Sequence, residues 1–335
     1  TPIESAEPGQ ANRWSQLAPR NTPPAGVALE APATEGETAP ADQGPRISAA
    51  MDKLFPNRQS GPAKEPVLPG PSASPFDTAG FHAAKADDFM SRGEYRKAKD
   101  EYLLALRQNA RDAEMRAKLA SAYLALDEVD NAEAQARRAV EIDPANALAC
   151  LKLGETLYQA GRYSDASAYA LQAVQIDPQN ADAQLLMGDV YEKLGRQESA
   201  RAAFENARKL TPESPRPLLK LGNLRLQIGD YDQARQLFLE AVKLDPEFVP
   251  AHNNLGVLAR QLNDFEEARD RFRQVVDIDP TWSKAWFNLG VLYEVEFDDP
   301  REAIRCYQKY LENGGGPRAD EARASIAQLR ANLRR

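Results

Sequence analysis

The residue types that most often carry chemistry are scarce in this chain. It contains two histidines, His82 and His252, and two cysteines, Cys150 and Cys306. Neither histidine has a serine, cysteine or aspartate at a spacing that would support a nucleophile and its base. Neither cysteine has the spacing of a metal ligand. We therefore predict no catalytic residue, no bound metal and no cofactor, and we do not expect an enzyme.

Other signals for chemistry are equally weak. Carboxylates occur on nearly every predicted helical turn, as in solvated helices, and no pair stands out as an acid and a base. The one glycine cluster, Gly314 to Gly316, lacks the following Lys-Ser/Thr of a phosphate-binding loop. Both histidines and Cys150 fall at the same position of a repeating unit, which favours a packing role for them.

Charge and hydropathy exclude further classes of function. The net charge is −8 with both signs interspersed, which argues against a nucleic-acid surface. No apolar run approaches the roughly 20 residues that span a bilayer, so we expect no direct membrane insertion. The chain begins at Thr1 without Met and uses more Arg than Lys. These features favour a bacterial periplasmic or cell-envelope protein, with the cytoplasm as the alternative, although unpaired cysteines argue mildly against an oxidising compartment.

A period of 34 residues organises most of the chain. It is shared by a proline series, a glycine series and an alanine series: Pro144, Pro178, Pro212, Pro246, Pro280; Gly154, Gly188, Gly222, Gly256, Gly290; Ala98, Ala132, Ala166, Ala200, Ala234, Ala268. A fixed period of this length is typical of stacked repeats. Each unit predicts two helices, for example 147–160 and 163–176, and the short connection between them makes the pair antiparallel.

The glycine series predicts a close approach between paired helices. A mid-helix glycine costs about 1 kcal/mol relative to alanine, so its recurrence implies a place without room for a Cβ. We expect the alanine series to form the matching contact on the second helix. Larger residues should fill the core of each hairpin: Leu153, Tyr191, Phe204, Leu221, Phe238, Leu255, Phe272, Leu289 and Tyr293.

The ends of the chain differ from the repeats. Residues 1–78 hold 14 of the 24 prolines and predict a disordered or extended tether. Two islands in it, around Trp14 and at Ile47–Phe55, are candidate docking segments for a partner or for the repeats. The second island places Ile47, Met51, Leu54 and Phe55 on one side of a short helix. Residues 317–335 predict an amphipathic capping helix with Ala322, Ile326, Leu329 and Leu333 on its apolar side.

The repeats resemble tetratricopeptide repeats. The seventh unit carries the first-helix signature as Trp286, Leu289, Gly290 and Tyr293, followed by Ala303 and Tyr307. The resemblance covers residues 79–316 as seven repeats and implies an all-α fold, a right-handed α-solenoid. The first unit departs from it with Lys85-Ala86 in place of Leu-Gly. The seventh has one extra residue, after which Asp299, Pro300 and Glu302 predict a capped restart of the second helix.

The resemblance also implies a binding surface. In this family the first helix of each repeat lines the concave face and contacts extended peptides. The candidate partner-binding residues are Lys118, Lys152, Lys220, Asn223, Asn253, Asn254, Arg260, Lys284, Phe287 and Asn288. Asn223, Asn254 and Lys284 match three places of the carboxylate clamp of heat-shock co-chaperones, but Leu219 and Asn288 stand where basic residues are usual. The paired asparagines also resemble the asparagine ladder of other repeat domains. A merely solvated surface is the alternative.

Taken together, these features predict a non-catalytic scaffold or assembly factor that holds extended segments of partner proteins in the concave groove. The alternative is a permanent structural subunit of a larger envelope complex or a homo-oligomer, with the N-terminal tail running along its neighbours. The sequence leaves the partner and the oligomeric state open.

Overall fold

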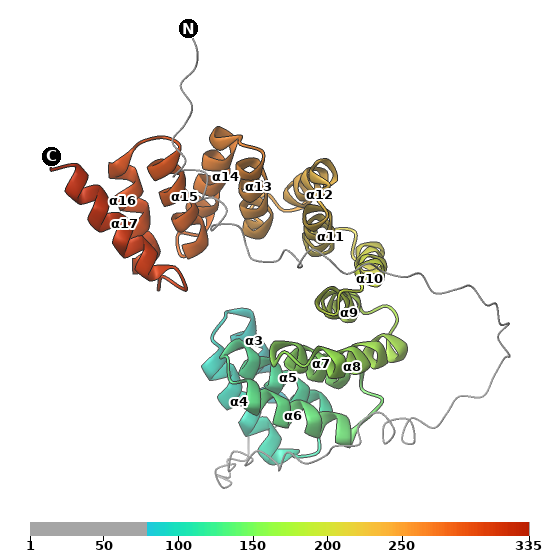
Figure 1. The fold of residues 1–335 in the computed structure, drawn as a ribbon. Helices are drawn as coiled ribbons and strands as arrows, with labels where there is room; N and C mark the ends of the chain where they lie inside the picture. The colour runs from blue at the N-terminus through green and yellow to red at the C-terminus, as the bar shows by residue number, and fades with distance from the viewer. Residues whose placement is uncertain (1–78, 335) are drawn as a thin grey trace, which may run out of the picture. The chain divides into compact units, whose positions relative to one another are not determined.

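The computed structural model describes residues 79–334 as fifteen α-helices, and this range contains no strand. Figure 1 shows the helices following one another as antiparallel pairs in chain order, from blue to red. The expected all-α solenoid of seven helical hairpins with a final capping helix is confirmed. The expected tether and its docking residues Trp14, Ile47, Met51, Leu54 and Phe55 lie outside the described residues, so their roles stay predictions.

Each hairpin consists of an A helix and a B helix. The A helices are α3 (Ala79–Ser91), α5 (Ala113–Ala125), α7 (Ala147–Gln159), α9 (Ala181–Lys193), α11 (Pro215–Gln227), α13 (Val249–Gln261) and α15 (Ser283–Val295). The B helices are α4 (Tyr95–Gln108), α6 (Val129–Ile142), α8 (Tyr163–Ile176), α10 (Gln197–Leu210), α12 (Tyr231–Leu244), α14 (Phe265–Ile278) and α16 (Pro300–Glu312). The capping helix α17 (Ala319–Asn332) packs on α16. All A helices begin 34 residues apart, so a position counted from their first residue is equivalent in every repeat.

The helix ends are set by local sequence. Gly161, Gly195 and Gly229 follow A helices with φ of 75°, 73° and 78°, the left-handed conformation that turns the chain toward the B helix. At the other end of an A helix, the start of α7, Asn146 acts as the N-cap. Its side chain accepts a hydrogen bond from the backbone N–H of Ala149 at 2.9 Å. These turns are short, which is why the two helices of each unit are antiparallel.

The extra residue of the seventh unit is absorbed as the sequence predicts. Asp299 accepts hydrogen bonds from the backbone N–H groups of Arg301 and Glu302, each at 3.1 Å, and Pro300 is the first residue of α16. This cap satisfies the first N–H groups of the helix and restarts it after the insertion.

The fourth position of the A helix fastens the loop that precedes it. Trp286 Nε1 donates to the carbonyl of Pro280 at 2.8 Å, and His252 Nε2 lies 2.8 Å from the carbonyl of Pro246. Arg116 and Cys150 contact the equivalent carbonyls, those of Ala110 and Pro144. His82, at the same position of the first repeat, instead lies 2.6 Å from the Glu101 carboxylate. Both histidines are buried, as a packing role requires.

Four of the five glycines lie beneath aromatic rings of the B helix, a contact that the sequence analysis did not name. A Cβ on Gly188 would lie 2.3 Å from the ring of Phe204, and one on Gly222 would lie 2.4 Å from the ring of Phe238. The alanines of the series are fully buried, but the contact that excludes a Cβ comes from these rings of the B helix. At Gly154 the repeat has Ala170 in place of an aromatic residue, and the B-helix backbone supplies part of the contact through the nitrogen of Ala170 and the oxygen of Ala166, a member of the alanine series.

We expect Gly188→Ala to destabilise the protein by about 1–3 kcal/mol, because the new Cβ meets a ring that cannot move aside. Gly154→Ala should stay within about 1 kcal/mol of the parent. Its Cβ would meet mainly a methyl group of Leu186, 2.9 Å away at the end of a flexible side chain, and alanine has the higher helix propensity. Chemical denaturation of both variants measures the difference. Adding Phe204→Leu to Gly188→Ala should restore part of the loss, and equal effects of the two single substitutions would contradict the explanation.

Candidate functional site

The A helices follow one another along one side of the hairpins. Each hairpin packs on the next through its B helix and the following A helix, and neighbouring A helices also contact one another, α5 with α7, α7 with α9 and α11 with α13. We call this surface the A face, made by the second, fifth, sixth, ninth and twelfth residues of the A helices α3 to α15. All ten partner-binding residues expected from the sequence stand at these positions, and nine of them are partly or fully exposed.

A ladder of polar contacts crosses the A face. Lys118 Nζ lies 3.0 Å from Asp87 Oδ2, and Lys220 Nζ lies 2.6 Å from Asp189 Oδ1. Asn254 Nδ2 donates to Asn223 Oδ1 at 2.6 Å. In each case the sixth residue of one A helix reaches the ninth residue of the preceding one. Four of the predicted binding residues, Lys118, Lys220, Asn223 and Asn254, therefore also hold neighbouring repeats together, a role that the sequence analysis missed.

The junction between α9 and α11 is the most polar part of the A face. Besides the Lys220–Asp189 pair, Arg216 Nη1 lies 2.6 Å from Asp182 Oδ1, and Gln227 Nε2 donates to Glu192 at 2.5 Å. We call these six residues the polar seam. Burial raises the pKa of Asp189, whose side chain is 19% exposed, while the ammonium of Lys220 opposes this rise. Long polar side chains thus join these two A helices beside an apolar cluster that contains Leu185 of α9 and Leu221 and Leu224 of α11.

Amide groups dominate the A face from α11 to α15. Asn253 Nδ2 donates to Asn254 Oδ1 at 3.3 Å, which continues the contact of Asn254 with Asn223. The Oδ1 atom of Asn253 is buried without a hydrogen-bond partner among the described residues. Arg260 Nη1 donates to Asn288 Oδ1 at 3.4 Å. These helices therefore bring four asparagines and an arginine onto one surface.

The cation at the end of this surface is poorly hydrated. Burial lowers the pKa of Arg260 to about 10, and the nearby guanidinium of Arg318 adds to the effect. Arg318 precedes α17 and binds Glu321 through two contacts of 2.8 Å. Arg318 is thus ion-paired within the capping region.

Three of the predicted partner-binding residues, Lys152, Lys284 and Phe287, are not part of the polar contacts between A helices described above. Lys152 forms an ion pair of 2.9 Å with Glu155 on its own helix, and Lys284 is exposed on α15. Phe287, which the sequence analysis placed among the partner contacts, is only 3% exposed. Its ring packs against Tyr307 and Tyr310, with the guanidinium carbon of Arg318 4.2 Å from the ring centre. We therefore place Phe287 in the core and leave it out of the proposed binding surface.

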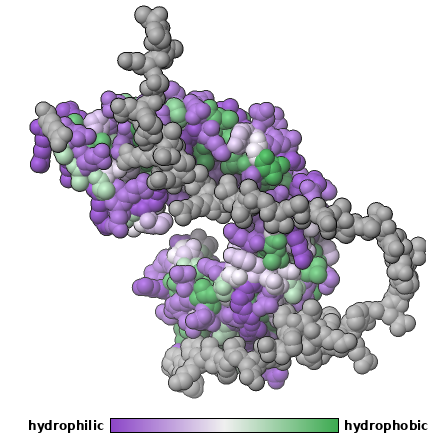
Figure 2. Space-filling model, viewed as in Figure 1, coloured by the Kyte–Doolittle hydropathy of each residue, from purple (hydrophilic) through white to green (hydrophobic). Residues whose placement is uncertain are grey.

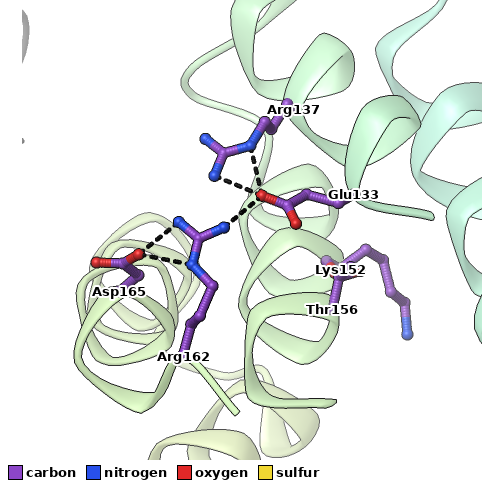
Figure 3. Close-up of polar contacts among 6 residues, drawn as sticks. All are labelled: Glu133, Arg137, Lys152, Thr156, Arg162 and Asp165. Carbon is purple, nitrogen blue, oxygen red and sulfur yellow. Dashed lines mark hydrogen bonds and ion pairs between the residues drawn. The ribbon is translucent and has the colours of Figure 1, made fainter. Parts of the chain in front are cut away.

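Ion pairs connect neighbouring B helices on the other side of the hairpins. Figure 3 shows Glu133 of α6 accepting from Arg137 and from Arg162, at 2.6 and 2.7 Å, and Arg162 also binding Asp165 of α8. The ammonium of Lys152 points away from this network. Further pairs join α10 to α12 and α12 to α14, namely Arg208 with Glu240 and Arg235 with Glu267. Ion pairs therefore join neighbouring B helices as they join neighbouring A helices.

The described residues offer little for catalysis. No group of three or more His, Cys, Asp or Glu within residues 79–334 could hold a metal ion. Burial raises the pKa of both Cys150 and Cys306 to about 12, so neither thiol is an activated nucleophile. In the same range, every helix is too short or too polar to cross a membrane.

Known sequences and structures agree with this arrangement. Family models of the tetratricopeptide repeat match residues 83–147, 151–215 and 219–281, and a further model of the repeat matches 283–313. These segments make up more than half of the chain. No curated protein matches the sequence at a significant level.

Several solved structures share the fold at low sequence identity. The hetero-tetramer Cut9–Hcn1 of the APC/C contains a chain 19% identical, with a TM-score of 0.59 over 76% of this chain and 49% of that chain. A tetratricopeptide repeat protein from Parabacteroides merdae is 14% identical, with a TM-score of 0.58 over 75% and 98%. Pseudomonas aeruginosa pilF is 22% identical, with a TM-score of 0.50 over 60% and 92%. The chain thus spans about half the length of the Cut9–Hcn1 chain that it matches, and these likenesses concern the fold alone.

The polar seam predicts a pH effect centred on Asp189. Because the pKa of Asp189 is higher in the folded than in the unfolded chain, the folded state binds the extra proton between these two values. This group therefore lowers stability as pH rises through that window. Lys220→Met removes the cation that opposes the shift, so the pKa of Asp189 should rise further and stability at neutral pH should fall. Carboxyl NMR titration of the parent, of this variant and of Lys243→Met on the exposed side of α12 measures the pKa. An unchanged value in Lys220→Met would contradict the assignment.

Proposed function

The chain belongs to the tetratricopeptide repeat family, and from this premise we propose that it is a non-catalytic scaffold that binds extended segments of partner proteins on the A face. Solenoids of this family generally mediate protein–protein interaction or complex assembly. The observation that carries the finer proposal is the row of polar side chains that recurs along neighbouring A helices.

The spacing of this row suits an extended polypeptide. Packed helices lie about 8–10 Å apart, so equivalent side chains recur along the A face at about that interval. An extended chain rises about 3.3 Å per residue, and three residues therefore span one repeat. A groove with regularly placed donors can then contact the backbone carbonyls of a bound segment once per repeat.

The ladder contacts leave hydrogen-bonding capacity for a partner. An asparagine amide carries two N–H groups and an oxygen with two lone pairs. The contact between Asn254 and Asn223 uses one N–H and one lone pair. Each of these side chains therefore retains groups that can bind a partner's backbone while the repeats stay joined.

The location expected from the sequence, a bacterial cell envelope, is a separate hypothesis. The similarity to Pseudomonas aeruginosa pilF is a similarity of fold, and it leaves the place of this chain open. Fractionation of cells that express the native protein would test the hypothesis directly.

We expect substitutions on the A face to release partners. The triple variant Lys220→Ala, Asn254→Ala and Asn288→Ala removes one donor from each of three adjacent repeats, which at about 1 kcal/mol per hydrogen bond should weaken binding by at least tenfold. Partners crosslinked to the parent protein in its native cells supply the ligands, and their affinity for purified parent and variant is then measured.

The matched control lies on the B helices. Arg201→Ala, Lys209→Ala and Lys243→Ala remove the same number of polar side chains from exposed positions of α10 and α12. This control should leave the affinity unchanged. Loss of binding in the control but not in the A-face variant would place the binding surface on the B helices and overturn the proposal.

A further inference from the structure

Exposed apolar side chains recur at the turn between the A helix and the B helix. Ile228 and Leu262 follow directly on their A helices, α11 and α13, and are 56% and 43% exposed. Both are the fourteenth residue of their repeat. Tyr231 and Phe297, in the corresponding turns of the fifth and seventh repeats, are partly exposed as well. We call the segments 227–232, 261–266 and 295–300 the turn edge.

The packing of the solenoid does not require an apolar residue at the fourteenth position. The third repeat has Ala160 there and the seventh has Glu296, and both repeats still form a helical hairpin. An apolar side chain left in water forgoes about 25 cal/mol for each Å² that burial would remove from solvent. The presence of Ile228 and Leu262 in adjacent repeats therefore indicates a use other than folding.

Side-chain contacts hold the three turns next to one another. Gln261 Nε2 donates to the hydroxyl of Tyr231 at 3.1 Å, which joins the turns of the fifth and sixth repeats. The guanidinium carbon of Arg269, on α14, lies 5.1 Å from the ring centre of Phe297 and joins the sixth repeat to the turn of the seventh. Ile228 and Leu262 therefore stand in touching turns.

The turn edge is acidic throughout. Its three segments contain two, two and three carboxylates, and neither Lys nor Arg. The turn before them, 193–198, differs because it carries Lys193, Arg196 and a single carboxylate. The first cation after the turn edge is Arg301. The acidic stretch thus coincides with the repeats that expose Ile228 and Leu262.

Only part of this negative charge is used within the chain. The N-caps of α12, α14 and α16 are Asp230, Asp264 and Asp299. Arg225 lies 3.7 Å from Asp230, and Arg269 lies 2.6 Å from Glu266. The other three carboxylates, those of Asp232, Glu296 and Asp298, form no ion pair with another residue of the range 79–334. Their charge is therefore available to a ligand.

The carboxylates of the turn edge do not gather around one point. Among the described residues, no group of three or more His, Cys, Asp or Glu could hold a metal ion. Cations carried at intervals along a partner therefore match the turn edge better than a single ion does.

We propose that the turn edge of the last three repeats binds a basic amphipathic helix of a partner protein. The apolar side of this helix covers Ile228 and Leu262, and its Lys or Arg side chains contact Asp232, Glu296 and Asp298. This second surface is separate from the A face and does not rest on the proposed function.

The spacing of the turns suits a helix. Packed helices lie about 8–10 Å apart, so equivalent turns of adjacent repeats recur at about that interval. An α-helix rises 1.5 Å per residue, so two residues seven apart lie on the same side and about 10 Å from one another. One apolar residue in every two helical turns can therefore meet each turn of the solenoid. Cations that flank those residues then lie beside the carboxylates, which favours association of opposite charges.

A defined peptide tests the proposal on the full-length chain. The probe is a fluorescein-labelled eighteen-residue helical peptide with blocked termini, with leucines along one side and lysines beside them. Its binding is measured by fluorescence anisotropy. We expect saturable binding that weakens several-fold as salt rises from low to physiological strength. A peptide of the same composition with its leucines spread around the helix should bind at least tenfold more weakly, and so should the peptide with Gln in place of Lys.

The apolar contact is tested at exposed positions, where folding is not at risk. Ile228→Ser with Leu262→Ser should weaken binding of the basic peptide about tenfold. The matched control is Leu171→Ser with Leu239→Ser, which changes two leucines of the B helices that are 44% and 40% exposed. This control should bind the peptide as the parent does.

The charged contact has its own pair of variants. Asp232→Asn with Asp298→Asn should weaken binding several-fold and reduce its salt dependence. Asparagine suits the left-handed φ of 46° at Asp298. The control is Glu213→Gln with Glu247→Gln, two exposed carboxylates in the turns that precede A helices, and its affinity should be unchanged.

Several results would overturn the inference. One is equal binding of the Lys and Gln peptides, and another is unchanged affinity in Ile228→Ser with Leu262→Ser, or a loss no larger than in the leucine control. A parent dimer in sedimentation velocity that this double variant dissociates would assign the turn edge to a second copy of the chain. Tighter peptide binding after Leu54→Ser with Phe55→Ser would assign it to the chain's own N-terminal segment.

The A-face variant separates this inference from the proposed function. Lys220→Ala, Asn254→Ala and Asn288→Ala together should leave binding of the basic peptide unchanged. Weakening as large as that in Ile228→Ser with Leu262→Ser would place the peptide on the A face and overturn the inference. A native partner released by the A-face variant supports the proposed function whether or not the basic peptide binds.

Discussion

The last four repeats depend on one steric constraint, the close contact between a mid-helix glycine of the A helix and an aromatic ring of the B helix. At Gly188, Gly222, Gly256 and Gly290 a Cβ would lie within 2.3–2.7 Å of a ring carbon. Glycine costs helix stability at each of these places, and the ring that covers it returns apolar burial. Because the contact recurs in successive repeats, it gives these hairpins a common geometry and lets them stack in register.

Because the hairpins stack regularly, side chains at equivalent positions of successive A helices lie next to one another and form a long surface. Each A helix presents its sixth residue toward the ninth residue of the preceding A helix, so that polar side chains of adjacent repeats bind one another. The A face is therefore partly preorganised before any partner arrives, which reduces the ordering cost of binding. The same contacts tie recognition to stability, because Lys220 and Asn254 serve the solenoid as well as the proposed ligand.

Charge divides the A face into two parts with different properties. At the polar seam the cations of α11 bind carboxylates of α9, so their charge is balanced within the chain. At α13 and α15 the guanidinium of Arg260 donates to the amide oxygen of Asn288, and Arg318 nearby is bound to Glu321. Figure 2 shows that hydrophilic residues cover most of the visible side of the described chain, with hydrophobic ones interspersed. Recognition by polar and charged groups is consistent with such a surface.

The sequence by itself determined the repeat and its local structure, because these follow from residues close together in the chain. The 34-residue period, the glycine turns, the restart at Asp299 and the buried aromatic residues all follow from helix and turn preferences that act over a few residues. The fold class is therefore predictable from the sequence, and the structure confirms it.

Only the tertiary structure decided which side chains meet across repeats. Lys220 meets Asp189, and Asn254 meets Asn223, 31 residues away in both cases, because adjacent A helices are offset as they stack. The same stacking buries Phe287 under Arg318 of the capping region, although its repeat position alone placed it on the A face. The position of a residue in the repeat predicts the side of its own helix on which its side chain lies. The packing of the next helix decides whether that face meets solvent, a ligand or the chain itself.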